Sequence, residues 1–327
     1  MKIVIIGAGG MGCLFAALLT KAKEEVWLID NHKERAERIR KEGIRVEGIS
    51  KFKIQNSKFK ITLAPREAGV AELLIIFVKA YDTEKAVIDA LPTIGKETTI
   101  LTLQNGLGNI EKIKETLSIQ NSKFKIQNSN PLSPHLTIQA GTTSQGATVL
   151  GPGYIRHAGE GETIIGELSG KITPRLKSIA RVFNSAGIET KLTDNLEGLI
   201  WSKLLINVGI NAICSIIKVK NGSLLENAEA LRLMEGAVSE AVRITEKKGI
   251  TLLYDNPQEK VKSICQATKE NINSMLQDIL NKKRTEIDFI NGAIVEEGEN
   301  LGIPTPVNKT LTCLVRAMEN VKIKNKI

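Results

Sequence analysis

The sequence predicts an α/β protein in two parts, a parallel-sheet domain over 1–193 and an all-helical domain over 194–327. Two observations carry this prediction. In the first part, short apolar runs without alternation, such as Leu73–Val78, are separated by helical stretches, which is typical of strands buried on both faces of a parallel sheet. In the second part, helical apolar spacing continues almost without interruption, over 194–217, 228–249, 257–279 and 282–301.

A glycine-rich turn lies between the first predicted strand and the first predicted helix. The apolar run 1–6 is followed by Gly7-Ala8-Gly9-Gly10-Met11-Gly12, after which apolar residues recur at helical spacing. In this G-x-G-x-x-G pattern Gly7 permits a tight turn, Gly9 lets the backbone approach a pyrophosphate, and Gly12 lets helix and strand pack closely. The helix start offers amides and the positive end of its dipole to phosphate. The pattern indicates a Rossmann-type dinucleotide-binding domain.

Further candidate residues stand where predicted strands end. The second strand, Glu25–Ile29, ends at Asp30, whose carboxylate can hydrogen-bond the ribose hydroxyls of a dinucleotide. Lys79 follows the strand that begins at Leu73, and Asn105 follows the strand at 98–103. Ligands of open parallel sheets bind outside the carboxyl ends of the strands. Lys79, Asn105 and the loop 141–147 are therefore site candidates by position.

The remaining elements of the first part follow in order. Charged and apolar spacing predicts helices at 33–43 and 173–186, and short apolar runs predict strands at 136–140 and 189–192. The glycine-rich stretch 151–167 alternates polar and apolar residues and predicts an antiparallel hairpin that ends the sheet. His157 lies in this hairpin, and a lone histidine on a strand favours a structural role.

A polar stripe interrupts the apolar stretch Gly198–Ile217. Lys203, Asn207 and Asn211 are spaced by four residues, so on a helix they lie one above the other on one face. A buried ammonium is costly unless something pairs with it. One interpretation is a core lysine with two hydrogen-bonded asparagines. We favour the other, a face that binds a polar ligand.

The net charge of +9 arises largely from a repeated string. Ile-Gln-Asn-Ser-Lys-Phe-Lys-Ile occurs at 54–61 and again at 119–126, within longer tracts at 50–61 and 118–129. Removing the six lysines of these tracts takes the net charge from +9 to +3. Two copies without regular spacing are not a solenoid, and because most of the net charge comes from these tracts we expect no nucleic-acid partner. We expect surface-loop insertions that contribute little to a core.

Cysteine usage and hydropathy indicate a cytoplasmic protein that contacts no membrane. The four cysteines are scattered, no Cys-x-x-Cys pair occurs and the three histidines do not cluster, so neither a disulfide scaffold nor a metal site is expected. No uninterrupted run of eighteen apolar residues occurs. The first strand is predicted from Lys2, so no signal segment is expected.

The combined motifs resemble those of the ketopantoate reductase family, over nearly the whole chain apart from the two repeat tracts. The glycine motif is joined by Val-Lys-Ala at 78–80, Gln-Asn-Gly-Leu-Gly at 104–108, Gly-Thr-Thr at 141–143 and His-Ala-Gly-Glu-Gly at 157–161. In the second half the matching motifs are Trp-Ser-Lys-Leu at 201–204, Asn-Gly at 221–222, Ser-Met-Leu-Gln-Asp at 274–278, Arg-Thr-Glu-Ile-Asp at 284–288 and Asn-Gly at 291–292. The resemblance implies a helical domain like the C-terminal domain of 6-phosphogluconate dehydrogenase. It also implies NADPH-dependent reduction of 2-dehydropantoate (ketopantoate) to pantoate, toward pantothenate and coenzyme A.

The resemblance also assigns roles to residues. It makes Lys203 the catalytic lysine and places Glu286 near it and the cofactor. The implied substrate-binding residues are Asn105, Asn207, Asn211, Asn221 and Ser274. The implied cofactor contacts beyond the glycine motif are Lys79, Asn105 and Ala147. A homodimer is a further implication. From the residues alone, Glu286 would be a surface carboxylate beside Lys282-Lys283-Arg284.

The cofactor expectation contains a conflict. An NADP enzyme needs a cation for the 2′-phosphate, whereas a carboxylate at Asp30 would repel it. His32, Lys33 and Arg35 follow closely and can form the cationic site. We therefore expect NADPH to be used, with NADH as a second cofactor that is only weakly discriminated against.

Two other functions remain open from the sequence. A related enzyme could reduce a different 2-keto acid, and nothing in the chain excludes it. A regulator could bind a dinucleotide as a sensor without chemistry, but such a protein needs neither Lys203 nor Glu286.

Overall fold

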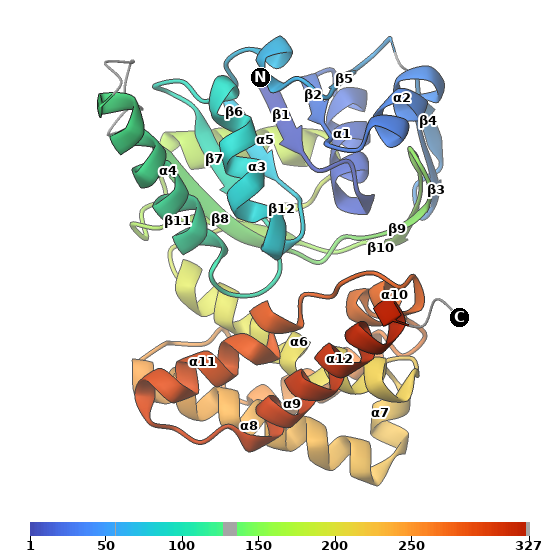
Figure 1. Ribbon diagram of the computed structural model, residues 1–327, viewed down its shortest axis with the longest axis vertical. Coiled ribbons are helices and arrows are strands. Elements are labelled where there is room, and N and C mark those ends of the chain that lie inside the picture. Colours follow the sequence, from blue (N-terminus) through green and yellow to red (C-terminus); the bar gives the residue numbers. More distant parts are fainter. Residues whose placement is uncertain (56, 127–135, 325–327) are drawn as a thin grey trace. The chain divides into compact units, whose positions relative to one another are not determined.

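The computed structural model describes residues 1–55, 57–126 and 136–324, and confirms the α/β fold class (Figure 1). The chain divides into two compact units. Met1–Gln104 and Asn109–Leu196 form the sheet unit, while Asn105–Gly108 and Glu197–Ile327 form the helical unit. The four residues Asn105–Gly108 thus belong with the helical unit, although they follow a strand of the sheet.

The main sheet is parallel at its centre. Across the described residues it has the strand order β12-β11-β8-β7-β6-β1-β2-β5. Strand β1 pairs in parallel with β2 and β6, and β11 is antiparallel to β8. The strands are β1 (Lys2–Ile6), β2 (Glu25–Ile29), β5 (Lys60–Thr62), β6 (Leu73–Ile76), β7 (Thr99–Thr102), β8 (Thr137–Thr143), β11 (Thr163–Glu167) and β12 (Thr190–Thr193).

Helices cover both faces of this sheet. Along β1, Ile3 and Ile5 belong to one apolar core while Val4 and Ile6 belong to another, because successive strand residues point to opposite faces. This burial on both faces explains why the strands lack polar alternation. The covering helices are α1 (Gly10–Lys21), α2 (Lys33–Glu42), α3 (Thr83–Ala90), α4 (Asn109–Ile126) and α5 (Pro174–Ser185), with short 3₁₀ turns η1 (Pro65–Ala68), η2 (Ala80–Asp82) and η3 (Leu91–Thr93).

A second, smaller sheet corrects the predicted hairpin. Its order is β4-β3-β10-β9, formed by β3 (Ile44–Gly48), β4 (Phe52–Ile54), β9 (Gly146–Gly151) and β10 (Tyr154–Gly159). The hairpin is β9–β10, earlier than predicted, and it pairs with β3 instead of ending the main sheet. Within the stretch 151–167, the strand that belongs to the main sheet is β11. The glycine turn at Gly153, with φ +69°, allows the reversal between β9 and β10.

The described parts of the repeat tracts contribute to strands and a helix, which corrects the expectation that both tracts are loop insertions. In the first copy, Ile54 ends β4 and Lys60 begins β5, and Ile54, Phe59 and Ile61 are buried in the core. In the second copy, residues 119–126 form the last turns of α4, and 127–129 lie outside the described residues. Lys60 and Ile61 of the first copy pair with the edge of β2. The second copy instead continues the helix that begins at Asn109.

The helical unit also departs from its predicted boundaries. The predicted helix 257–279 is two helices, because Asn273 caps a new one by accepting a hydrogen bond from Leu276 N at 3.0 Å. The predicted helix 282–301 begins only at Asn291, and a final helix from Pro306 was not predicted. The helices are α6 (Leu196–Ile217), α7 (Ser223–Glu226), α8 (Ala228–Lys248), α9 (Pro257–Ala267), α10 (Ser274–Leu280), α11 (Asn291–Leu301) and α12 (Pro306–Lys324), with the 3₁₀ turn η4 (Ile287–Phe289).

Helix α6 is the core of the helical unit. It is the one described helix long and apolar enough to cross a membrane by length and composition, yet 67% of its apolar window is buried inside the protein. This burial is typical of a core helix. At Gly209 an added Cβ would lie 2.9 Å from methyl groups of Val238 and Val261, so the glycine lets α8 and α9 approach α6 closely.

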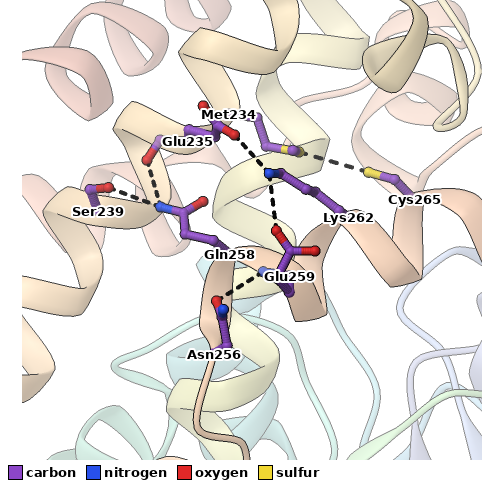
Figure 2. Close-up of polar contacts among 8 residues, drawn as sticks. All are labelled: Met234, Glu235, Ser239, Asn256, Gln258, Glu259, Lys262 and Cys265. Atoms are coloured by element: carbon purple, nitrogen blue, oxygen red, sulfur yellow. Dashed lines mark hydrogen bonds and ion pairs between the residues drawn. The ribbon is translucent and has the colours of Figure 1, made fainter.

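Helices α8 and α9 are tied to each other by polar contacts, drawn in Figure 2. Gln258 Nε2 donates to Glu235 O and Ser239 Oγ, both at 2.9 Å, and Lys262 Nζ lies 2.8 Å from the Glu235 carboxylate. Asn256 Oδ1 caps α9 by accepting from Glu259 N at 3.1 Å. These contacts fix α8 and α9 to each other.

Candidate functional site

The glycine motif has the backbone geometry that a dinucleotide requires. Gly7 has φ +103°, and an added Cβ would lie 3.0 Å from the backbone of Phe77. A Cβ at Gly12 would lie 1.8 Å from Gly7 O, so only glycine lets α1 pack on the turn. At Gly9, by contrast, no atom of the described chain lies within 4 Å of the added Cβ, and no side chain caps α1. These features are the ones expected of a loop that receives a pyrophosphate at the helix start.

Strand β9 borders this loop. A Cβ on Gly10 would lie 2.7 Å from Ala147 O, so the backbone of Ala147 lies against the glycine turn. Ala8 is buried, and Met11 is half-buried against the core. The structure therefore brings Ala147, expected near the cofactor, next to the glycine motif.

Asp30 follows β2 and is paired. Arg35 on α2 donates from Nε and Nη2 to both carboxylate oxygens, and His32 N donates to Oδ1 at 3.2 Å. The hydrogen bond to Asp30 raises the pKa of Arg35. The negative charge expected to repel a 2′-phosphate is thus compensated by one of the cations expected to attract it.

The carboxyl ends of β6 and β7 are joined by Gln104. Its Nε2 donates to Val78 O at 2.8 Å and to Thr83 Oγ1 at 2.9 Å. Lys79 is half-buried and precedes η2 at this end of β6. The predicted position of Lys79, at the carboxyl end of a central parallel strand, is the one the structure has.

Asn105 is brought to the helical unit by a short glycine loop. Leu107 N donates to Phe289 O at 2.9 Å. Gly106 has φ +84°, and an added Cβ would lie 2.4 Å from Phe289 O, so a side chain there would collide with the backbone. The loop that carries Asn105 therefore packs on the segment that carries Glu286, a proximity that sequence distance does not suggest.

Lys203 and Glu286 interact within the helical unit. Lys203 is half-buried on α6, and Glu286, expected from the residues alone at the surface, is only 6% exposed. Burial lowers the pKa of Lys203 to about 8, and the nearby Glu286 charge opposes that shift. The sequence left open which influence is stronger. In the structure, burial has the stronger influence on the pKa of Lys203.

The predicted helix through Lys203, Asn207 and Asn211 is confirmed as α6. Asn207 is half-buried and Asn211 is 5% exposed. Their four-residue spacing on a continuous helix places the two amides on the face of the lysine. This face offers one ammonium and two amides, which are donors suited to carboxylate and hydroxyl groups.

Asn221 and Ser274 lie on neighbouring segments, but their side chains differ in exposure. Asn221 is buried, with Nδ2 donating to Thr268 Oγ1 at 3.0 Å and Oδ1 accepting from Asn273 Nδ2 at 3.3 Å. Ser274 is exposed at the start of α10. Asn221 thus holds the loop that leads into Ser274.

Comparison with known proteins identifies the family. The family model described as Ketopantoate reductase PanE/ApbA matches residues 3–170, and the model described as Ketopantoate reductase PanE/ApbA C terminal matches residues 195–319. The 2-dehydropantoate 2-reductase of Pyrococcus horikoshii is 36% identical over 322 residues, 98% of this chain and 98% of the relative. The chain belongs to the ketopantoate reductase family. It is an oxidoreductase of that family, as its motifs implied.

Solved structures agree with the assignment to the ketopantoate reductase family. A ketopantoate reductase from Ralstonia eutropha JMP134 has a TM-score of 0.86 at 30% identity, covering 99% of this chain and 100% of its own. D-mandelate dehydrogenase, solved with NADH and anilino(oxo)acetate, has a TM-score of 0.86 at 29% identity with the same coverage. The fold of this ketopantoate reductase family member is thus also similar to that of an enzyme named for a different hydroxy acid.

Sequence reasoning missed a buried polar network in this ketopantoate reductase family member. Asn291, Asn308 and Glu240 are at most 3% exposed and hydrogen-bonded to one another across three helices. The motif Thr-Pro at 305–306 is a helix-start signal that could have revealed α12, and with it a buried asparagine in the first turn. Nothing in the sequence indicated that Glu240 on α8 would accept from that turn.

Proposed function

We propose that this protein reduces 2-dehydropantoate to pantoate with NADPH, and that Lys203 is the general acid. The observation that carries the proposal is a partly buried lysine on α6 whose pKa is lowered to about 8 with Glu286 beside it. Reduction of ketopantoate is the activity of the family to which the chain belongs, and curated relatives in several organisms bear that name.

The chemistry assigned to Lys203 follows from its pKa. Hydride addition to a keto carbon leaves an alkoxide, which needs a proton and a nearby positive charge. An ammonium with a pKa near 8 is largely protonated at pH 7 and gives up its proton more readily than an exposed lysine. The Glu286 charge opposes the effect of burial and favours the ammonium form. Lys203 would hold the proton at Nζ and deliver it to the substrate oxygen.

The cofactor would be held by the sheet unit. Bound NADPH supplies the hydride. Gly7–Gly12 would receive the pyrophosphate at the start of α1, and the family resemblance adds Ala147, Lys79, Asn105 and Glu286 as further cofactor contacts. Because Arg35 compensates Asp30, the adenosine end can accept either a ribose hydroxyl or a 2′-phosphate. This arrangement supports NADPH with weak discrimination against NADH.

The substrate would be held by amide and hydroxyl groups. Asn207, Asn211 and Asn105 supply donors for a carboxylate and a hydroxyl group, and Ser274 supplies an exposed hydroxyl. Asn221 would act through the loop it holds before Ser274. A homodimer and a cytoplasmic location remain predictions from the family resemblance and from cysteine usage.

A second candidate is reduction of another 2-keto acid. The observation in its favour is the similarity to D-mandelate dehydrogenase, whose structure holds NADH and anilino(oxo)acetate. Its similarity to this chain nearly equals that of the ketopantoate reductase from Ralstonia eutropha. A sensor without chemistry is less well supported, because Lys203 and Glu286 interact as an acid site requires.

The test is an absorbance assay of cofactor oxidation with purified protein. Ketopantoate should be compared with phenylglyoxylate, pyruvate and branched 2-keto acids, each with NADPH and with NADH. We expect the highest kcat/KM with ketopantoate and NADPH. A higher value with phenylglyoxylate would favour the second candidate, and dinucleotide binding without turnover of any substrate would favour the sensor.

A further inference from the structure

The segment Thr285–Asn291, which carries Glu286, is held at several points within the helical unit. Thr285 N donates to Glu319 Oε1 on α12 at 2.7 Å. Phe289 O accepts from Leu107 N, in the loop that carries Asn105, at 2.9 Å. Asn291 Nδ2 donates to Val208 O, in the middle of α6, at 3.1 Å. The last contact links the segment directly to the helix of Lys203.

Asn291 belongs to a buried polar network. It is fully buried, and its Nδ2 also donates to Asn308 Oδ1 at 2.9 Å. Asn308 in turn donates from Nδ2 to Ala237 O at 3.0 Å and to Glu240 Oε2 at 2.7 Å. Glu240 accepts from Val307 N and Asn308 N at the start of α12. The network therefore joins α6, α8, α11 and α12.

A role in stability alone does not explain Asn291 well. Its Oδ1 is buried and has no hydrogen-bond partner among the described residues, so the bonds that Nδ2 makes to Val208 O and Asn308 Oδ1 come with a desolvation cost. The gain is geometric, because a side-chain amide that donates to two acceptors fixes the helix register where apolar packing would not. The register fixed here is that of α11 on α6.

We propose that Asn291 is a positioning residue that clamps the Glu286 segment onto α6 and so holds the Glu286 carboxylate beside Lys203. The proposal rests on the function proposed above, in which Lys203 is the acid. Glu286 is the charged side chain whose field acts on Lys203 in the described structure. Val208 lies five residues after Lys203, so a clamp there fixes the turns of α6 that carry both Lys203 and Asn207.

The test is the pH dependence of kcat in Asn291→Ala and Asn291→Ser, with Glu240→Gln as matched control. Glu240→Gln weakens the same network but leaves the bond from Asn291 to Val208. We expect Asn291→Ala to lower kcat about tenfold, as for a small displacement of a catalytic group. The basic limb of the kcat–pH profile of Asn291→Ala should move to lower pH by about half a unit or more, because the Glu286 carboxylate then stabilises the Lys203 ammonium less.

Asn291→Ser, whose hydroxyl can still donate, should lie between Asn291→Ala and the wild type. Glu240→Gln should lower the melting temperature without moving the limb, and the NADPH dissociation constant should be unchanged in all three variants. An unmoved limb in Asn291→Ala, an upward shift, or an equal shift in Glu240→Gln would overturn the proposal. So would failure of both Asn291 variants to fold, since Asn291 would then be a folding residue. A wild-type profile with no basic limb near pH 8 would instead refute the role of Lys203 itself.

Discussion

The sheet unit and the helical unit each bury a carboxylate beside a cation, and the two pairs are built differently. Asp30 accepts two hydrogen bonds from Arg35, and this contact raises the pKa of the guanidinium. In the helical unit, the Glu286 charge acts on Lys203, but burial is the larger influence and lowers the pKa of the ammonium to about 8.

Because their cations differ, the Asp30–Arg35 pair is suited to binding and the Glu286–Lys203 pair to proton transfer. A guanidinium cannot be deprotonated in a protein, so Arg35 offers a fixed positive charge next to Asp30. An ammonium changes pKa readily when buried, so Lys203 can release a proton near neutral pH. A carboxylate beside a cation can thus serve two purposes, and the identity of the cation together with its burial decides which.

The largest expected effect follows from removing the titrating cation. Lys203→Ala should lower turnover by on the order of a hundredfold or more, as expected for the loss of a general acid. The NADPH dissociation constant should change little, because the glycine motif lies in the sheet unit. Turnover and cofactor binding are measured on protein shown by circular dichroism to be folded. Near-normal turnover would leave Lys203 as a structural lysine.

Removing the fixed cation should instead affect the cofactor. Arg35→Ala leaves Asp30 uncompensated, so NADPH affinity should fall by about tenfold, with a smaller loss for NADH. Arg38→Ala is the matched control, since Arg38 lies on the same helix and pairs with Glu42 at the surface. Steady-state constants with both cofactors provide the measurement. A wild-type preference for NADPH of several hundredfold would show that Asp30 does not weaken discrimination.

Removing the Glu286 charge tests its influence on the pKa of Lys203. Because the Glu286 charge raises the pKa of Lys203 against the effect of burial, Glu286→Gln should lower it further. The active form of the acid is the ammonium, so the basic limb of the kcat profile should move to lower pH, by about one unit. The matched change in the other pair, Asp30→Asn, should leave that limb in place. A limb that moves upward in Glu286→Gln would contradict this account.

The smallest expected effect is on stability. The folded-state pKa of Lys203 lies below its unfolded value, so the unfolded chain binds more protons between about pH 8 and 10.5, and the lysine's cost to folding diminishes across that window. Lys203→Met should remove this pH dependence and add on the order of 1–2 kcal/mol of stability at pH 7. Urea unfolding of both proteins at pH 7 and pH 10 measures the difference. Equal slopes with pH in the two proteins would be inconsistent with a depressed pKa.

Patterns that depend on local periodicity were predictable from the sequence. The glycine motif, the buried strands and the stripe on α6 each depend on residues close in the chain, and the structure has all three. The repeated octapeptide shows that the same local sequence can adopt different secondary structures. The copy at 54–61 ends β4 and begins β5, where it pairs with the edge of β2. The copy at 119–126 forms the end of the helix α4.

The candidate site was predictable only in part for the same reason. Spacing placed Lys203, Asn207 and Asn211 on one face, but the burial of Glu286 depends on the turn η4 and on contacts far apart in sequence. The packing of Gly106 against Phe289 and the bond from Asn291 to Val208 join residues separated by more than eighty positions. No periodicity in a single sequence encodes such contacts.

The most direct test of the account is a titration of Lys203 itself. Protein labelled with 13C at the lysine ε-carbon is followed by NMR from pH 6 to pH 11, and Lys203→Met assigns the resonance by its disappearance. The account predicts that this resonance titrates near pH 8, well below the other lysines, and still lower in Glu286→Gln. A Lys203 resonance that titrates near 10.5 with the exposed lysines would contradict the assignment of Lys203 as a general acid tuned by burial.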